Sequence, residues 1–239
     1  MTTTEPGIIG GIGLTHLQVY EQRPAPDGTM SGCAHVHALT DEAYYVIAGT
    51  GAIELNDRER GFRSVPLSKG SFVQFPPGTL HRSVSTGGLE VLAIMGNAGL
   101  AERGDARIYF GAAVDSDPME FARLVALPHD RGMEGALERR DASVRAYRRL
   151  LDLWPHERTA YFAELDRFLD LHARDVATRR AEYETVIRQG PERWLRLAFD
   201  RLATTGLAGE TALRQRQDAA PVKLGMCGTL RQFEGLAPI

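Results

Sequence analysis

The sequence predicts a β jelly-roll barrel followed by an α-helical region. From about residue 8 to residue 110, short apolar runs alternate with turn residues. Strands this short and this frequent are typical of jelly-roll barrels. From about Asp117 onward, apolar residues instead recur at helical spacing. We therefore expect a mainly β barrel over residues 1–113 and a helical extension over residues 114–239.

The strand signals of the first region come from apolar runs bounded by turn residues. The clearest runs cover residues 15–20, 43–47 and 91–95, and a further strand is expected at 107–110. Clusters of Gly, Pro, Asn and Asp predict turns between the strands. These clusters lie at residues 24–28, 49–51, 56–57 and 87–88.

The helix signals of the second region begin at Asp117, where an N-cap residue precedes Pro118. Longer helices are expected over residues 133–154, 157–189 and 191–202. After Thr204 the signal weakens, and the glycine-rich residues 222–239 are interpreted as a tail that packs on a neighbour. The apolar stripe of these helices predicts a packing surface. It would cover the barrel or a second subunit, and a lid over the barrel mouth is the alternative.

Two histidines separated by one residue mark the candidate site. His35 and His37 would lie on one strand and point to the same side of it, because alternate side chains of a strand face the same way. Glu42 begins the next strand, and the 76–78 turn directs His81 back across the barrel. Imidazole nitrogens and a carboxylate oxygen suit iron, manganese, nickel, copper or zinc. We predict one divalent ion per chain, bound by all four residues with positions left open for substrate.

The spacing of these residues resembles the two sequence motifs of the cupin superfamily. The first, G-x5-H-x-H-x3,4-E-x6-G, and the second, G-x5-P-x-G-x2-H-x3-N, are matched by His35, His37, Glu42, Gly49, Gly70, Pro76, Gly78 and His81. The opening glycine of the first motif is displaced, and Ser85 stands at the closing asparagine, but neither position is a ligand in the family. The resemblance implies a single-domain metal-binding cupin with a C-terminal helical extension. Fe(II) is favoured as the metal, with Zn, Ni, Mn or Cu as alternatives.

The resemblance leaves the reaction open, because the family includes oxygenases, decarboxylases, isomerases, lyases, cyclases and non-catalytic binding domains. We expect an enzyme acting on a small molecule that coordinates the metal, in first place an Fe(II)-type oxygenase of a biosynthetic or catabolic pathway. A metal-dependent isomerase, lyase or cyclase is the alternative, and a non-catalytic binding or sensor protein is the second alternative. Tyr44 shares a strand face with Glu42, and Cys33 shares one with His35. These two residues are the catalytic candidates.

Composition excludes several other classes. The net charge of −3 gives no indication of nucleic-acid binding. No apolar stretch is long enough for a bilayer, and the first residues do not resemble a signal peptide. The two cysteines are far apart in sequence and predict no disulfide framework. We expect a cytoplasmic homodimer that binds neither nucleic acid nor membrane.

Overall fold

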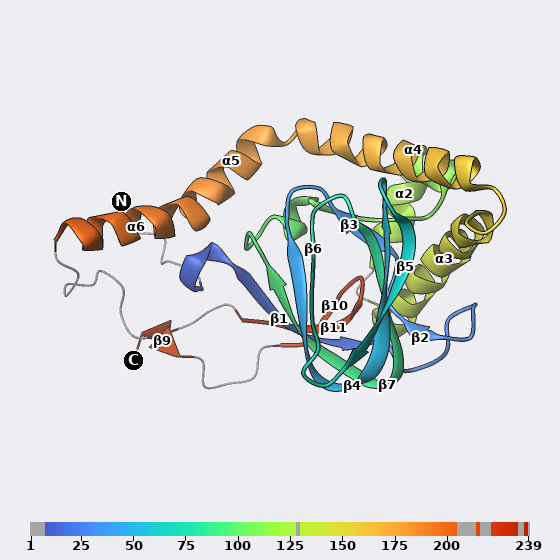
Figure 1. The fold of residues 1–239 in the computed structure, drawn as a ribbon, viewed down its shortest axis with the longest axis horizontal. Coiled ribbons are helices and arrows are strands. Elements are labelled where there is room, and N and C mark those ends of the chain that lie inside the picture. Colours follow the sequence, from blue (N-terminus) through green and yellow to red (C-terminus); the bar gives the residue numbers. More distant parts are fainter. Residues whose placement is uncertain (1–7, 128–129, 205–213, 216–220, 234–236, 239) are drawn as a thin grey trace.

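A computed structural model describes residues 8–127, 130–204, 214–215, 221–233 and 237–238. Ten strands form one antiparallel sheet, and helices pack against it (Figure 1). The sheet curves as a jelly roll does, but its hydrogen-bonded strand order runs from β10 to β8 without closing. The predicted fold class is confirmed, with an open sheet in place of a closed barrel.

Two long strands, β4 (Glu42–Asp57) and β7 (Leu80–Met95), pair along most of their length. The turns predicted at residues 49–51 and 87–88 are wrong, because both segments lie inside these strands. The register shifts three times between Val46 and Gly51, which marks an irregular, bulged stretch. Gly49 adopts a φ of 76°, and a Cβ there would lie 2.0 Å from the carbonyl oxygen of Gly88. The facing glycines therefore let both strands bend without ending.

This bend divides the sheet into two halves that face each other. Strands β6 (Phe72–Phe75) and β5 (Gly61–Ser68) pair with the two halves of β4. On the other edge, β7 pairs successively with β3 (His35–His37), β2 (Met30–Ser31) and β1 (Gly13–Val19). Apolar side chains fill the space between the halves, including Leu17, Val46, Ile53, Phe75, Leu89 and Val91.

Further strands extend both edges. β8 (Ala106–Ile108), which overlaps the strand predicted at residues 107–110, pairs with β3. β11 (Gly228–Gln232) pairs with β1 and forms a hairpin with β10 (Lys223–Leu224). The sheet thus takes two strands from the C-terminal segment, in which the sequence signal is weak. A separate strand pair joins β9 (Arg214–Gln215) to β12 (Ala237–Pro238).

The helices follow β8 in the chain. They are α1 (Ala112–Asp115), α2 (Pro118–Val125), α3 (Gly132–Leu153), α4 (Arg158–Ala177), α5 (Arg180–Gln189) and α6 (Pro191–Ala203), and the 3-10 helices are η1 (Ile9–Gly11) and η2 (Ala101–Arg103). Asp117 caps α2 as predicted, because its side chain accepts hydrogen bonds from the backbone N–H groups of Met119 and Glu120.

The single helix predicted over residues 157–189 is wrong, since the chain turns between α4 and α5. Tertiary contacts explain the turn better than local propensity. Both the Tyr183 hydroxyl and the Arg179 guanidinium donate to the carbonyl of Arg103. The Tyr183 ring also packs with Leu100 and Val176. These contacts draw α5 toward the loop around η2.

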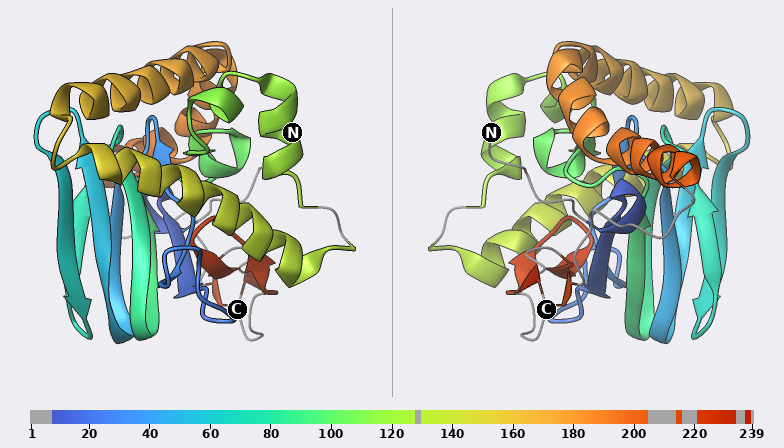
Figure 2. Two further views of the ribbon diagram at one scale, coloured as in Figure 1. Left: turned by 90° about the vertical axis from the view of Figure 1, so that its right-hand side faces the viewer. Right: turned by 90° about the vertical axis from the view of Figure 1, so that its left-hand side faces the viewer.

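Helices α3 and α4 cover one outer face of the sheet (Figure 2). Val36 and Leu80 from the strands pack with Tyr147, Leu150 and Phe168 from the helices, in one buried cluster. Val36 therefore faces the helices while its neighbours His35 and His37 face the interior. Among the described residues, no helix is both long and apolar enough to cross a membrane.

Candidate metal centre

The four predicted ligands lie together at one end of the space between the sheet halves. Strand β3 carries His35 and His37, β4 begins at Glu42, and His81 on β7 is the registered partner of His35. One donor atom from each side chain lies within 4.8 Å of the donor atoms of the other three. Glu42 Oε2 is 3.1 Å from His81 Nε2 and 3.3 Å from His37 Nε2. All four side chains are buried.

Hydrogen bonds to Nδ1 orient each imidazole. His35 Nδ1 lies 3.2 Å from the carbonyl oxygen of Cys33, and His81 Nδ1 lies 3.0 Å from that of Thr79. His37 Nδ1 lies 3.1 Å from Asp105 Oδ2. Because these oxygens only accept, each Nδ1 carries a proton, and each Nε2 has a lone pair for the centre when its imidazole is neutral. This tautomer is the one that metal-binding histidines use when Nε2 is the ligand.

The donor set fits a metal ion. Glu42 Oε2 and His81 Nε2 are buried, and neither has a hydrogen-bond partner among the described residues. Buried polar atoms usually have partners, so such a pair calls for a ligand. Burial works against the Glu42 carboxylate, but the neighbouring His81 and His37 hold its pKa well below the usual range. The carboxylate is therefore ionised, as a metal ligand must be.

The imidazoles differ in their protonation. Burial, together with the nearby His81 and His37, holds the pKa of His35 well below its ordinary value. Burial also opposes the charged form of His37, but Asp105 and Glu42 outweigh it and raise its pKa to about 9. Proton binding at His37 therefore competes with metal binding.

Two residues at the centre lie outside the sequence prediction. Asp105 is fully buried, and its other carboxylate oxygen accepts from the backbone N–H groups of Ala38 and Leu39. Cys227 Sγ lies 3.3 Å from His35 Nε2. Neither residue belongs to a recognisable motif, and only the pairing of β3 with β8 and of β11 with β1 brings them to the site. Burial raises the pKa of the Cys227 thiol well above its ordinary value, so it stays protonated.

The two predicted catalytic residues are buried beside the centre. The Tyr44 hydroxyl contacts Ser83 Oγ at 3.4 Å and Cys227 Sγ at 4.0 Å. Cys33 packs against Ile108 and Phe110 in an apolar cluster. Burial raises the pKa of Tyr44 well above its ordinary value and that of Cys33 to about 11, so both are uncharged at neutral pH.

A pocket of about 750 Å³ opens onto the centre. His35, His37, Glu42 and Cys227 are among the residues that line it, whereas Tyr44 and Cys33 are not. Its walls come from β1, the loop around η2 and the β10–β11 hairpin, and the only described helix residue from α3 to α6 that lines it is Arg139. The volume suits a small organic molecule.

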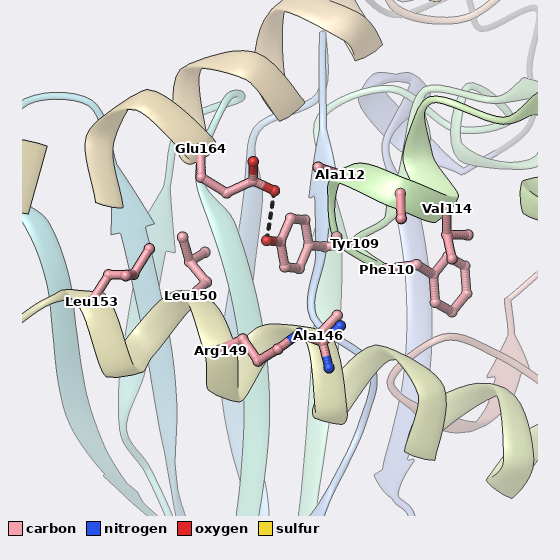
Figure 3. Close-up of a pocket in the computed structure, with 11 residues that line it drawn as sticks. Tyr109, Phe110, Ala112, Val114, Ala146, Arg149, Leu150, Leu153 and Glu164 are labelled. Carbon is pink, nitrogen blue, oxygen red and sulfur yellow. Dashed lines mark hydrogen bonds between the residues drawn. The ribbon is translucent and has the colours of Figure 1, made fainter. Parts of the chain in front are cut away.

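A second cavity of about 420 Å³ lies between the end of β8, α1, α3 and α4 (Figure 3). The Tyr109 hydroxyl donates to Glu164 across it at 2.8 Å, and Arg167 also pairs with Glu164. The Glu164 carboxylate therefore already has hydrogen-bond and ion-pair partners within the protein.

Comparison with known proteins gives a match to one family model and two partial relatives. The family model described as "Cupin domain" matches residues 21–95. A glucose-6-phosphate isomerase of Thermococcus onnurineus is 42% identical over 55 residues, which are 22% of this chain and 29% of that protein. A glucose-6-phosphate isomerase of Thermococcus gammatolerans is 39% identical over 56 residues, or 23% of this chain and 30% of that protein. The match thus spans less than a third of each relative.

Solved structures show only distant overall similarity. A cupin protein from Bacteroides fragilis is 15% identical, covers 41% of this chain and 82% of its own, and gives a TM-score of 0.29. A putative sugar phosphate isomerase from Acidithiobacillus ferrooxidans is 26% identical and gives a TM-score of 0.28. The match covers 36% of this chain and 49% of that protein.

Proposed function

We propose that this chain is a metal-dependent enzyme of the cupin type, since the cupin family model matches residues 21–95. Its substrate would be a small molecule that coordinates the metal through oxygen or nitrogen atoms. The observation that carries the proposal is the convergence of His35, His37, Glu42 and His81, three of which line a pocket, with two buried donor atoms that have no hydrogen-bond partner among the described residues.

The metal would act as a Lewis acid that polarises the bound substrate and stabilises negative charge on it. The protein would supply the four ligands and the orientation of their donor atoms. Four protein ligands leave two positions of an octahedral ion for substrate or water. The buried setting of the centre would strengthen electrostatic interactions with the bound molecule.

Within this class we favour a non-oxidative reaction of the isomerase type. The support comes from the two Thermococcus relatives, both glucose-6-phosphate isomerases, although each matches over a short segment only. Isomerisation of a hydroxy-carbonyl compound requires proton transfer beside a polarised carbonyl, which a divalent ion of several kinds can support.

An Fe(II)-type oxygenase is the second candidate. Two histidines and a carboxylate are the donor types of non-haem Fe(II) oxygenases, and His35, His37 and Glu42 provide them with His81 as a fourth ligand. The two candidates differ in their need for O₂ and in their preference for iron.

The test compares the protein loaded anaerobically with Fe(II) and with Zn(II) against a panel of small hydroxy acids and sugar phosphates. The isomerase-type proposal predicts incorporation of solvent deuterium into a substrate with both metals and no O₂ uptake. Substrate-dependent O₂ uptake with Fe(II) alone would favour the oxygenase. His81→Ala should lose turnover and metal together, and full turnover in metal-free protein would reject both candidates.

A further inference from the structure

One buried arginine extends from the helical region to the metal pocket. Arg139 lies on α3, is only 8% exposed, and lines the same pocket as His35 and Glu42. We propose that Arg139 binds an anionic group of the substrate, a carboxylate or a phosphate, while another part of the molecule reaches the metal centre. The inference rests on the proposed function and specifies its substrate class.

The charge of Arg139 has no counter-ion in the described part of the chain. No described carboxylate lies within 4.0 Å of its guanidinium. The nearest acids in the sequence already pair with other arginines: Glu138 pairs with Arg131, and Asp141 pairs with both Arg140 and Arg23. Buried charges are normally paired, because removal of an ion from water is costly. An anionic ligand would supply the missing partner.

The guanidinium also interacts with the Tyr20 hydroxyl and the Cys33 thiol, but not all of its donors are used. Of its five N–H bonds, one from Nη1 goes to the carbonyl of Val125 at 3.2 Å, and one from Nη2 goes to that of Gly225 at 2.7 Å. Nε is buried without a hydrogen-bond partner. Planar N–H donors of this kind match the oxygens of carboxylate and phosphate groups.

The tip of the β10–β11 hairpin connects Arg139 to the centre. Gly225, whose carbonyl Arg139 holds, is followed two residues later by Cys227, whose Sγ lies 3.3 Å from His35 Nε2. Two residues of chain span at most about 7 Å. The guanidinium and the ligand cluster therefore stand at neighbouring places on one pocket wall, and a molecule of a few carbon atoms could contact both.

A purely structural role would not require a charged residue. The Tyr20 hydroxyl already donates to the Gly225 carbonyl at 2.8 Å, so the hairpin tip keeps a donor without Arg139. The Met226 carbonyl, also at the tip, accepts from the backbone N–H of Cys33 at 2.8 Å.

The test uses Arg139→Met, which removes the charge and keeps most of the side-chain volume. Arg139→Lys retains the charge without the planar donors, and Arg145→Met removes an exposed charge from the same helix as a matched control. Inorganic phosphate and malonate are titrated calorimetrically into metal-free and Zn(II)-loaded protein. Binding of phosphate alone, of malonate alone or of both identifies which anionic group the site accepts.

We expect the wild-type protein and Arg145→Met to bind at least one of the two anions equally well. Arg139→Met should bind it about 10- to 100-fold more weakly, because a charge-assisted hydrogen bond is lost, and Arg139→Lys should lie between them. Arg139→Met should melt no lower than wild type without anion, since it removes an unpaired buried charge.

The proposal is overturned if neither anion binds the wild-type protein, or if Arg139→Met binds them as wild type does. A lowered melting temperature with unchanged anion binding would make Arg139 a structural residue. Normal metal content with no Arg139-dependent anion binding would reject this inference and leave the metal-dependent function standing. Arg139-dependent anion binding by a protein that takes up no metal would reject the metal-dependent function and leave the anion site standing.

Discussion

Replacement of Asp105 by Asn tests how the protein prepares its metal site. Asp105 Oδ2 accepts from His37 Nδ1 at 3.1 Å, while Oδ1 accepts from the N–H groups of Ala38 and Leu39 at 3.1 and 2.7 Å. The amide oxygen of Asn can keep the two backbone contacts. Its NH₂ group, however, cannot accept the His37 proton. The imidazole would then favour the tautomer protonated on Nε2, which has no lone pair for a metal.

The expected magnitude follows from the lost interaction. A hydrogen bond to a charged group contributes about 1.5–3 kcal/mol. Loss of a partner that orients a metal-binding histidine usually lowers metal affinity about 10- to 100-fold, which corresponds to about 1.4–2.8 kcal/mol. The two ranges agree, so Asp105→Asn should bind Zn(II) one to two orders of magnitude more weakly than wild type.

The assay is competition for Zn(II) against a fluorescent chelator at fixed pH. Asp115→Asn serves as the matched control, because Asp115 is equally buried but contacts Arg167 and the backbone of Phe110 instead of a metal ligand. Wild-type affinity in a folded Asp105→Asn protein would refute the orienting role of Asp105. Equal losses in both variants would point to general destabilisation.

Three further predictions concern the fold and its surfaces. Gly49→Ala should lower the free energy of unfolding by about 2–5 kcal/mol, because its φ is 76° and the new Cβ would lie 2.0 Å from a carbonyl oxygen. The control Gly70→Ala, at a glycine with positive φ and open space around it, should lower it by only about 1–2 kcal/mol in the same urea titration. Equal losses in the two variants would contradict the account of the bend. Burial raises the pKa of Asp115 from 3.8 to about 6, so the folded state holds its proton more tightly than the unfolded state. The resulting stabilisation of about 3 kcal/mol should be lost as pH rises between those values. Asp115→Asn should remove this pH-dependent decline in the free energy of unfolding, measured by urea titration, and an unchanged pH profile would contradict the assignment. Leu195, Phe199 and Leu202 are exposed on α6 at helical spacing, so the homodimer we propose should dissociate in Phe199→Asp when measured by light scattering, whereas a wild-type monomer would reject it.

The convergence of the four candidate ligands could be predicted from the sequence because it depends on local geometry. His35 and His37 share a strand face by alternation, and the 76–78 turn precedes His81 in a recognisable motif. Asp105 and Cys227 could not be predicted, since neither has a local pattern. Their places follow from strand pairings between segments far apart in the chain.

The fold shows the same division between local and distant effects. Asp117 and Pro118 mark the start of α2, and the cap is purely local. Glycines at residues 49 and 88 look like turn residues, yet they form an irregular bend because two long strands face each other there. In the sequence, Arg139 belongs to an Arg-rich run that is typical of a solvated helix face, and contact with an anionic substrate is the alternative. In the structure Arg139 is buried, and its guanidinium donates to the carbonyls of Val125 and Gly225.

X-ray absorption spectroscopy of the protein loaded with one equivalent of Zn(II), in wild type and in His81→Ala, tests the metal centre most directly. We predict 1:1 binding with a shell of imidazole nitrogens and carboxylate oxygen in the wild type, and the loss of one imidazole or of the metal in the variant. A wild-type protein that binds no metal, or an identical shell in His81→Ala, would contradict the assignment of these four residues as ligands.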